Sequence, residues 1–190
     1  MSPPAAGIWD MARTMSGYGL GLGLLTLSGL LLNYSGLDVA STTQFDFLII
    51  LLKTYTPLLT PLSSLLGSPA IGSAQTYGIL PAVIWVAVAC FIGFMAQEAG
   101  SGAKAMFLAA STVVILWIAS LFLSAPAWPD YMSWLTTLNY MMVGLTSRPL
   151  DILSILIIPT ASSALTGGLT QLIQSRIVKR AKIEEDNYLF

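Results

Sequence analysis

Residues 105–124 read AMFLAASTVVILWIASLFLS, a run without a single charged side chain. About 20 apolar residues in a helix cross the ~30 Å hydrocarbon core of a bilayer and satisfy their backbone hydrogen bonds within the segment. The whole chain has this character, because 55% of its 190 residues are hydrophobic and 9% are charged, whereas a soluble domain carries about 25% charged residues. The sequence therefore predicts an all-α, polytopic transmembrane helical bundle.

Three further stretches have the length and composition of a membrane span. They are residues 16–34, 78–97 and 150–171. Arg13 precedes the first, as in a signal peptide, but no small-residue cleavage site follows it, so we interpret this stretch as an uncleaved helix. Pro81 falls in the opening turn of the second, where a missing N–H costs little. Pro159, near the middle of the last, is expected to bend its helix.

Two more hydrophobic segments are flawed as spans. Residues 45–67 are long enough, but Lys53 lies near their centre and two prolines interrupt their second half. Residues 131–146 are short and contain Asn139. Each segment could be a tilted span, a re-entrant segment or an interfacial helix. We favour six crossings over four, since residues 45–67 have a full complement for a span.

The basic residues predict the orientation of the chain. Four of the eight Lys and Arg residues lie just after the last span, in a charged tail at 176–190 that follows a single transmembrane domain at 1–175. By the positive-inside rule this tail is cytoplasmic, and Arg13 indicates the same for the N-terminus. An even number of crossings follows. Residues 98–104 would be cytoplasmic with four crossings and outside with six, and Arg148 would be outside with either number.

Lys53 is the residue most suggestive of a function, because a lysine at the centre of a span costs about 2.5–3.5 kcal/mol on insertion scales. It could face a water-filled cavity, an anionic solute or a carboxylate of another subunit. Alternatively, the helix ends near Lys53, its amine reaches the headgroups, and residues 54–75 form a proline-rich surface loop. The candidate cavity or partner-contact residues are Lys53, Thr54, Tyr55, Thr56, Pro57, Thr60 and Asn139.

Small residues recur at helix-packing spacing in each of the four uninterrupted predicted spans. Such residues let membrane helices approach closely where hydrophobicity cannot drive them together. The predicted packing residues are Gly19, Gly23, Ala89, Gly93, Ala105, Ala109, Ala164 and Gly168. They favour a compact bundle, an oligomer or burial within a larger complex.

The missing residue types limit the chemistry that this chain can perform. It has no histidine and one cysteine, Cys90, which excludes imidazole-held haem, Cys/His zinc sites and Ser-His-Asp catalysis. We therefore expect no catalytic, cofactor-binding or metal-binding residue, and the net charge of −1 gives no reason to expect a nucleic-acid partner.

The resulting expectation is a non-catalytic integral membrane subunit of a larger assembly, whose partners are the lipid bilayer and other membrane subunits or copies of itself. The alternative is a passive channel or the substrate-binding membrane component of a transporter, with the broken helix at residues 53–61 lining the path. A pattern of three plus three segments would suit an inverted-repeat transporter. Any six-element membrane protein can be divided in this way, however, and the halves show no residue-level match.

Overall fold

The computed structural model describes residues 4–34 and 45–188, with side chains for 10–34 and 45–177. Every regular element in these ranges is a helix, which confirms the predicted all-α class. The α-helices and the two 3₁₀ turns (η) are α1 (Pro4–Leu32), α2 (Asp46–Tyr55), η2 (Thr56–Leu59), α3 (Pro61–Leu65), α4 (Leu80–Ala96), α5 (Ala99–Leu123), η3 (Ala125–Ala127), α6 (Tyr131–Thr146) and α7 (Pro149–Tyr188).

Three helices are long and apolar enough to cross a membrane. Their spanning parts are Asp10–Leu32 of α1, Ala99–Leu123 of α5 and Pro149–Ile177 of α7. The remaining predicted span, residues 78–97, forms α4, which is apolar but has only 17 residues. The count of six crossings is not confirmed, because the two flawed segments form helices of only 10 and 16 residues.

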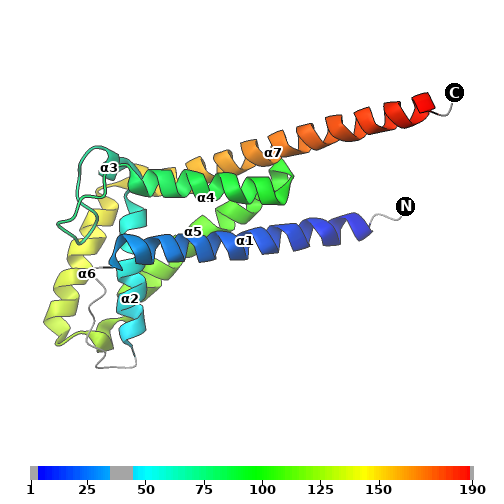
Figure 1. Ribbon diagram of the computed structural model, residues 1–190. Helices are drawn as coiled ribbons and strands as arrows, with labels where there is room; N and C mark the ends of the chain where they lie inside the picture. The colour runs from blue at the N-terminus through cyan, green and yellow to red at the C-terminus, as the bar shows by residue number, and fades with distance from the viewer. Residues whose placement is uncertain (1–3, 35–44, 189–190) are drawn as a thin grey trace.

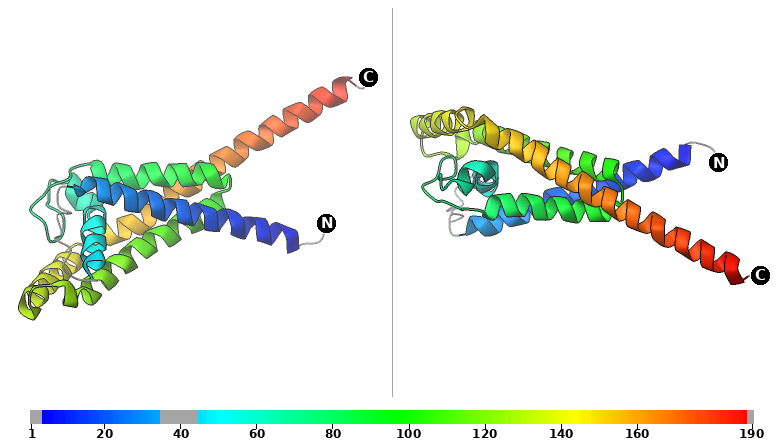
Figure 2. Two further views of the ribbon diagram at one scale, coloured as in Figure 1. Left: turned by 60° about the horizontal axis from the view of Figure 1, so that its bottom comes forward. Right: turned by 90° about the horizontal axis from the view of Figure 1, so that it is seen from above.

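The helices form a bundle with two shorter helices across one end. Helices α1, α4, α5 and α7 pack on one another, with α7 in contact with both α4 and α5. Helices α2 and α6 lie crosswise to them near the C-terminal end of α1 (Figures 1 and 2). The opposite end of the bundle holds the beginning of α1 and the turn between α4 and α5, and α7 leaves the bundle there.

The turn between α4 and α5 is only two residues long. Gln97 takes a left-handed conformation with a φ of 55°, and Glu98 is extended. The Gln97 N–H donates to the Gly93 carbonyl, which closes the end of α4. This left-handed cap is a common way to end a helix, and it reverses the chain so that α5 returns beside α4.

One face of α1 packs against α5 through glycine. The buried residues recur every three or four positions at Thr14, Gly17, Gly21, Leu25 and Gly29, the spacing of one helix face. A Cβ atom built on Gly17 would lie 3.1 Å from the Ala105 Cβ, and one on Gly21 would lie 3.4 Å from the Ala109 Cβ. Ala105 and Ala109 are therefore packing residues, as the sequence predicts.

Gly19 and Gly23, which the sequence also predicts as packing residues, contact no other helix within the described part of this chain. Both glycines are exposed, and a Cβ on either would have no atom within 4 Å. The glycines of α1 alternate along the chain, so that the set at 17 and 21 and the set at 19 and 23 lie on different faces of the helix. Only the first set faces α5.

The other predicted packing residues lie around α7. Ala89 is fully buried, Ala164 is half-buried, and a Cβ on Gly168 would contact the Ala99 Cβ at 3.6 Å. Gly93 is in closer contact still, because a Cβ there would overlap Ser163 and Thr166 of α7. Pro159, which is expected to bend its helix, lies inside α7, and the helix continues through it.

Asp130 caps the beginning of α6, and this contact predicts a dependence on pH. Its carboxylate accepts hydrogen bonds from the Ser133 backbone N–H at 2.8 Å and the Ser133 hydroxyl at 2.6 Å, and these bonds hold the pKa of Asp130 below its ordinary value. A carboxyl group whose pKa is lower in the folded than in the unfolded protein stabilises the fold at pH values above its pKa in the unfolded protein. This contribution is lost as the pH falls through its pKa in the folded protein.

We therefore expect Asp130→Ala to lower the melting temperature in detergent at pH 7, because the substitution removes the cap. The difference from the parent protein should begin to shrink below about pH 4, the ordinary pKa of an aspartate, and should be smallest below the lowered pKa of Asp130, where the carboxyl of the folded parent is itself protonated. The measurement is the melting temperature of both proteins across this range. A difference that is constant with pH would show that the charge of Asp130 does not matter to the cap.

Candidate functional site

The broken helix at residues 53–61 is buried inside the protein. Every residue from Thr54 to Pro61 has a buried side chain, and Lys53 is half-buried. The prolines give this segment its shape, because Pro57 and Pro61 lack an N–H and each stands at the beginning of a new short helix. The alternative that residues 54–75 form a surface loop is therefore wrong for their first eight residues, 54–61.

Hydrogen bonds tie this segment to three surrounding helices. The Tyr55 hydroxyl lies 2.8 Å from the Thr26 hydroxyl of α1. The two deepest tryptophans donate to the segment as well: Trp117 of α5 to the Thr56 hydroxyl at 3.0 Å, and Trp85 of α4 to the Leu58 carbonyl at 2.8 Å. The polar groups of the segment are thus used largely to hold it in the core.

A pocket of about 450 Å³ opens beside the first part of this segment. Lys53, Thr56 and Pro57 line it, together with Asn33, Ile49, Leu52, Gly72, Ser73, Gln75, Tyr77, Trp128, Thr137 and Met141. The end of α1, the loop before α4 and helix α6 therefore all contribute to its wall. Asn33 also donates to the Lys53 carbonyl at 2.9 Å, which fixes the end of α1 against α2.

The structure brings together only some of the predicted site residues. Thr54, Tyr55 and Thr60 are in the core and do not line the pocket. Asn139 is exposed on α6 and is not part of the lining either. Thr60 is fully buried, and its hydroxyl makes no hydrogen bond within the described residues. Lys53, Thr56 and Pro57 are thus the predicted residues that meet at one site.

Asp151 is a buried carboxylate that sequence reasoning missed. It is 2% exposed, at the beginning of α7. Its Oδ1 accepts from the backbone N–H groups of Leu62 at 2.8 Å and Ser63 at 2.9 Å, and its Oδ2 accepts from the Ser63 hydroxyl. Asp151 therefore caps α3 from another helix. An acidic residue in the first turn of a helix is favourable in itself. This position of Asp151 is the feature of the sequence that could have indicated a capping role.

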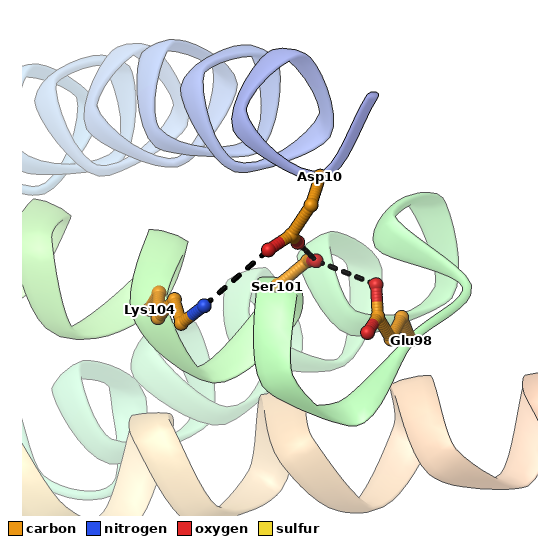
Figure 3. A network of polar contacts seen from close by, with 4 residues as sticks. All are labelled: Asp10, Glu98, Ser101 and Lys104. Carbon is orange, nitrogen blue, oxygen red and sulfur yellow. Dashed lines mark hydrogen bonds and ion pairs between the residues drawn. The ribbon is translucent and has the colours of Figure 1, made fainter. Parts of the chain in front are cut away.

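A second polar network lies at the opposite end of the bundle. The Ser101 hydroxyl contacts the carboxylates of both Asp10 and Glu98, and the Lys104 ammonium lies 3.4 Å from Asp10 (Figure 3). Lys104 and Asp10 are 63% and 38% exposed, so this ion pair contributes little to stability. The ion pair does, however, hold the beginning of α1 next to the α4–α5 turn.

Among the described residues, neither the pocket beside Lys53 nor the polar network around Ser101 has the ligands of a metal centre. Among the residues that the structure describes, no group of three or more His, Cys, Asp or Glu side chains could hold a metal ion. The half-buried Cys90 forms no disulfide. No known protein family, curated protein or solved structure matches this chain.

Proposed function

We propose that this protein is a non-catalytic integral membrane subunit of a larger assembly, and that it supplies helix packing and lipid contacts. The observation that carries the proposal is the filled interior of the bundle. Fully buried apolar side chains from four helices meet there, among them Leu25, Ile92, Val113, Trp117 and Ile155. The outer surface is also apolar, with Phe91, Phe107 and Ile115 all more than 45% exposed, as suits contact with lipid or other helices.

The filled interior also favours a subunit over a passive channel. A channel needs a continuous polar path, whereas Trp85 and Trp117 are almost completely buried and occupy the space beside the broken helix. The pocket near Lys53 lies at one end of the bundle, where α2 and α6 lie crosswise. A path through a single copy of the chain would have to pass these side chains.

Four crossings fit this packing better than six. The contact between Asp10 and Lys104 joins the beginning of α1 to the α4–α5 turn, which supports a common side of the membrane for both. Of the two counts, only four crossings, at α1, α4, α5 and α7, place residues 98–104 on the side of the N-terminus. The arrangement we propose has α2 and α6 near the opposite surface and both termini in the cytoplasm.

Labelling of single cysteines from either side of the membrane tests the count. In a Cys90→Ala background, the exposed positions Gly100 and Ser175 would each be changed to cysteine. Four crossings predict that both label from the same side. Labelling from opposite sides would support six crossings. Ser68→Cys gives a second test, because four crossings place it on the side opposite to Ser175 and six crossings place it on the same side.

The proposed function is tested by the native mass of the detergent-extracted protein. We expect it to purify with unlike membrane chains, which a mild crosslinker added before extraction should retain. Recovery as a monomer or as copies of itself alone, with solute flux in proteoliposomes, would overturn the proposal in favour of a transporter. Lys53→Met offers a further comparison, since a subunit with a filled interior should still assemble.

A further inference from the structure

A second pocket opens between α3 and the beginning of α7. Its volume is about 460 Å³, which falls in the range of small-molecule sites, roughly 300–1,000 Å³. Helix α3 lies against the beginning of α7 at the end of the bundle where α2 and α6 lie crosswise (Figure 1). The part of α7 that is long and apolar enough to cross a membrane begins at Pro149, which lines this pocket. With α7 across the bilayer, the pocket is therefore at the level of the lipid headgroups.

Arg148 is the side chain of this pocket with hydrogen-bond donors to spare. Its guanidinium donates from Nη1 to the Pro69 carbonyl at 2.8 Å, and no carboxylate of the described chain forms an ion pair with it. A guanidinium has five N–H donors, so this one contact fixes its position and leaves other donors for a ligand. The two serine hydroxyls of the lining, at positions 63 and 147, already donate within the protein.

The carboxylate of Asp151 lines the same pocket but is directed to α3. Asp151 is 2% exposed, and both of its carboxylate oxygens accept hydrogen bonds from the first residues of that helix. Arg148 is half-buried and makes its contact with the loop before α4 instead. Of the two charged groups in the described lining, the guanidinium is thus the one that a ligand can reach.

Membrane orientation does not account for an arginine at position 148. Basic residues favour the cytoplasmic side of a membrane protein, and cytoplasmic termini place Arg148 on the other side with either four or six crossings. Its positive charge therefore opposes the orientation that the C-terminal basic residues favour. A ligand with a negative charge gives this arginine a role that orientation does not.

Exposed leucines form the apolar part of the pocket. Leu66 is 86% exposed, Leu150 is 68% exposed and Leu65 is 45% exposed, and all three line the pocket beside Arg148. A small anion bound to the guanidinium would leave this surface uncovered. A ligand with a phosphate group and a hydrocarbon chain would cover it and match the charge as well.

We infer that this pocket binds one phospholipid of the surrounding bilayer. The Arg148 guanidinium holds the phosphate, and an acyl chain lies over Leu66 and Leu150. Arginine is suited to this role, because its planar group can donate two parallel hydrogen bonds to phosphate oxygens. The inference rests on the membrane location of α7, and it is independent of whether the protein is a subunit or a transporter.

Native mass measurements on the purified, delipidated full-length chain in detergent test the inference. The chain would be titrated with phosphatidylglycerol, with diacylglycerol of the same acyl chains and with glycerol phosphate. We expect phosphatidylglycerol to bind more tightly than either of the others by about tenfold or more, the usual effect of a charge-assisted hydrogen bond. Arg148→Gln should abolish this advantage over diacylglycerol, and Leu66→Ser should weaken both lipids alike.

The comparison of the two lipids separates phosphate binding from a merely structural role of Arg148. If the arginine only held the loop at Pro69, Arg148→Gln would weaken both lipids equally, and this result would overturn the inference. Glycerol phosphate that binds as tightly as phosphatidylglycerol would also overturn it, because the leucines would then contribute nothing. So would equal affinities of the parent and Arg148→Gln for phosphatidylglycerol.

Two further variants place the lipid in this pocket. Lys104→Gln is the matched control, because it removes an exposed cation near the α4–α5 turn, at the opposite end of the bundle, and it should leave all three affinities unchanged. Ser147→Cys, in a Cys90→Ala background, introduces a thiol at an exposed position of the lining. Bound phosphatidylglycerol should slow its reaction with a water-soluble maleimide, whereas an unchanged rate would contradict binding at this site.

Discussion

Gly93→Ala should destabilise this protein more than any other single methyl group added to its helices. A Cβ at this position would overlap the Thr166 hydroxyl and the Ser163 carbonyl, and would lie 3.0 Å from the Gly167 backbone nitrogen. Two of these three atoms belong to the backbone of α7, so the helices themselves must separate. We expect a loss of about 2–3 kcal/mol in the free energy of unfolding, in the range of overpacked cores.

Gly23→Ala is the matched control for this prediction. It adds the same methyl group to α1, a helix long and apolar enough to span a membrane, at a position where no atom lies within 4 Å. Alanine is a better helix former than glycine by roughly 0.5–1 kcal/mol, so this variant should be as stable as the parent or slightly more stable. Unfolding in detergent by a denaturing surfactant measures both. Similar stabilities for the two variants would show that α4 and α7 do not meet at Gly93.

Asp151→Ala should produce the second large effect. The substitution leaves the backbone N–H groups of Leu62 and Ser63 without the carboxylate that now accepts from them. An unsatisfied buried donor costs about 1–3 kcal/mol, and because Leu62 and Ser63 are half-buried we expect a total loss of about 1–3 kcal/mol for the pair. Local opening should accompany it, because α3 is a single short helix held from outside by this cap.

Limited proteolysis in detergent would detect that opening as faster cleavage within residues 62–79. Asp151→Asn is the informative comparison, because its remaining oxygen can still accept from both backbone groups and its nitrogen can donate to the Ser63 hydroxyl. Its stability should fall between that of the parent and that of Asp151→Ala. If the alanine variant kept the parent's stability and cleavage rate, the cap would be without energetic importance.

The sequence predicts the long helices well because composition and length determine them. Helix α6 has the predicted limits of Tyr131 and Thr146, and α5 contains the predicted span at 105–124 apart from its last residue, Ser124, which caps the helix. The face that each helix presents to its neighbours is harder to predict. Glycine at alternate positions of α1 offers two faces, and only the position of Ala105 and Ala109 on the neighbouring helix selects between them.

The candidate site beside Lys53 was predictable only in part, because tertiary packing decides which residues line it. Lys53 and the prolines after it mark an interrupted helix in any reading of the sequence, and the pocket does lie there. Asn139 is predicted as a site residue from its polarity alone, but it is exposed on the outer face of α6. Ser73 and Gln75 come from a loop without periodicity, and Asp151 meets Ser63 across 88 residues of sequence. Contacts of this kind depend on tertiary packing, which no local pattern encodes.

The two-residue connection at Gln97 and Glu98 also bears on how the bundle assembles. Closing so short a loop costs little chain entropy, so α4 and α5 should pair early as a helical hairpin. Helix α7 is made later, and Ser163 and Gly167 then dock against Gly93 and Gly102 of this hairpin. Helix α7 therefore packs last against this hairpin. A substitution at Gly93 should impair this late step and leave α7 undocked from α4 and α5.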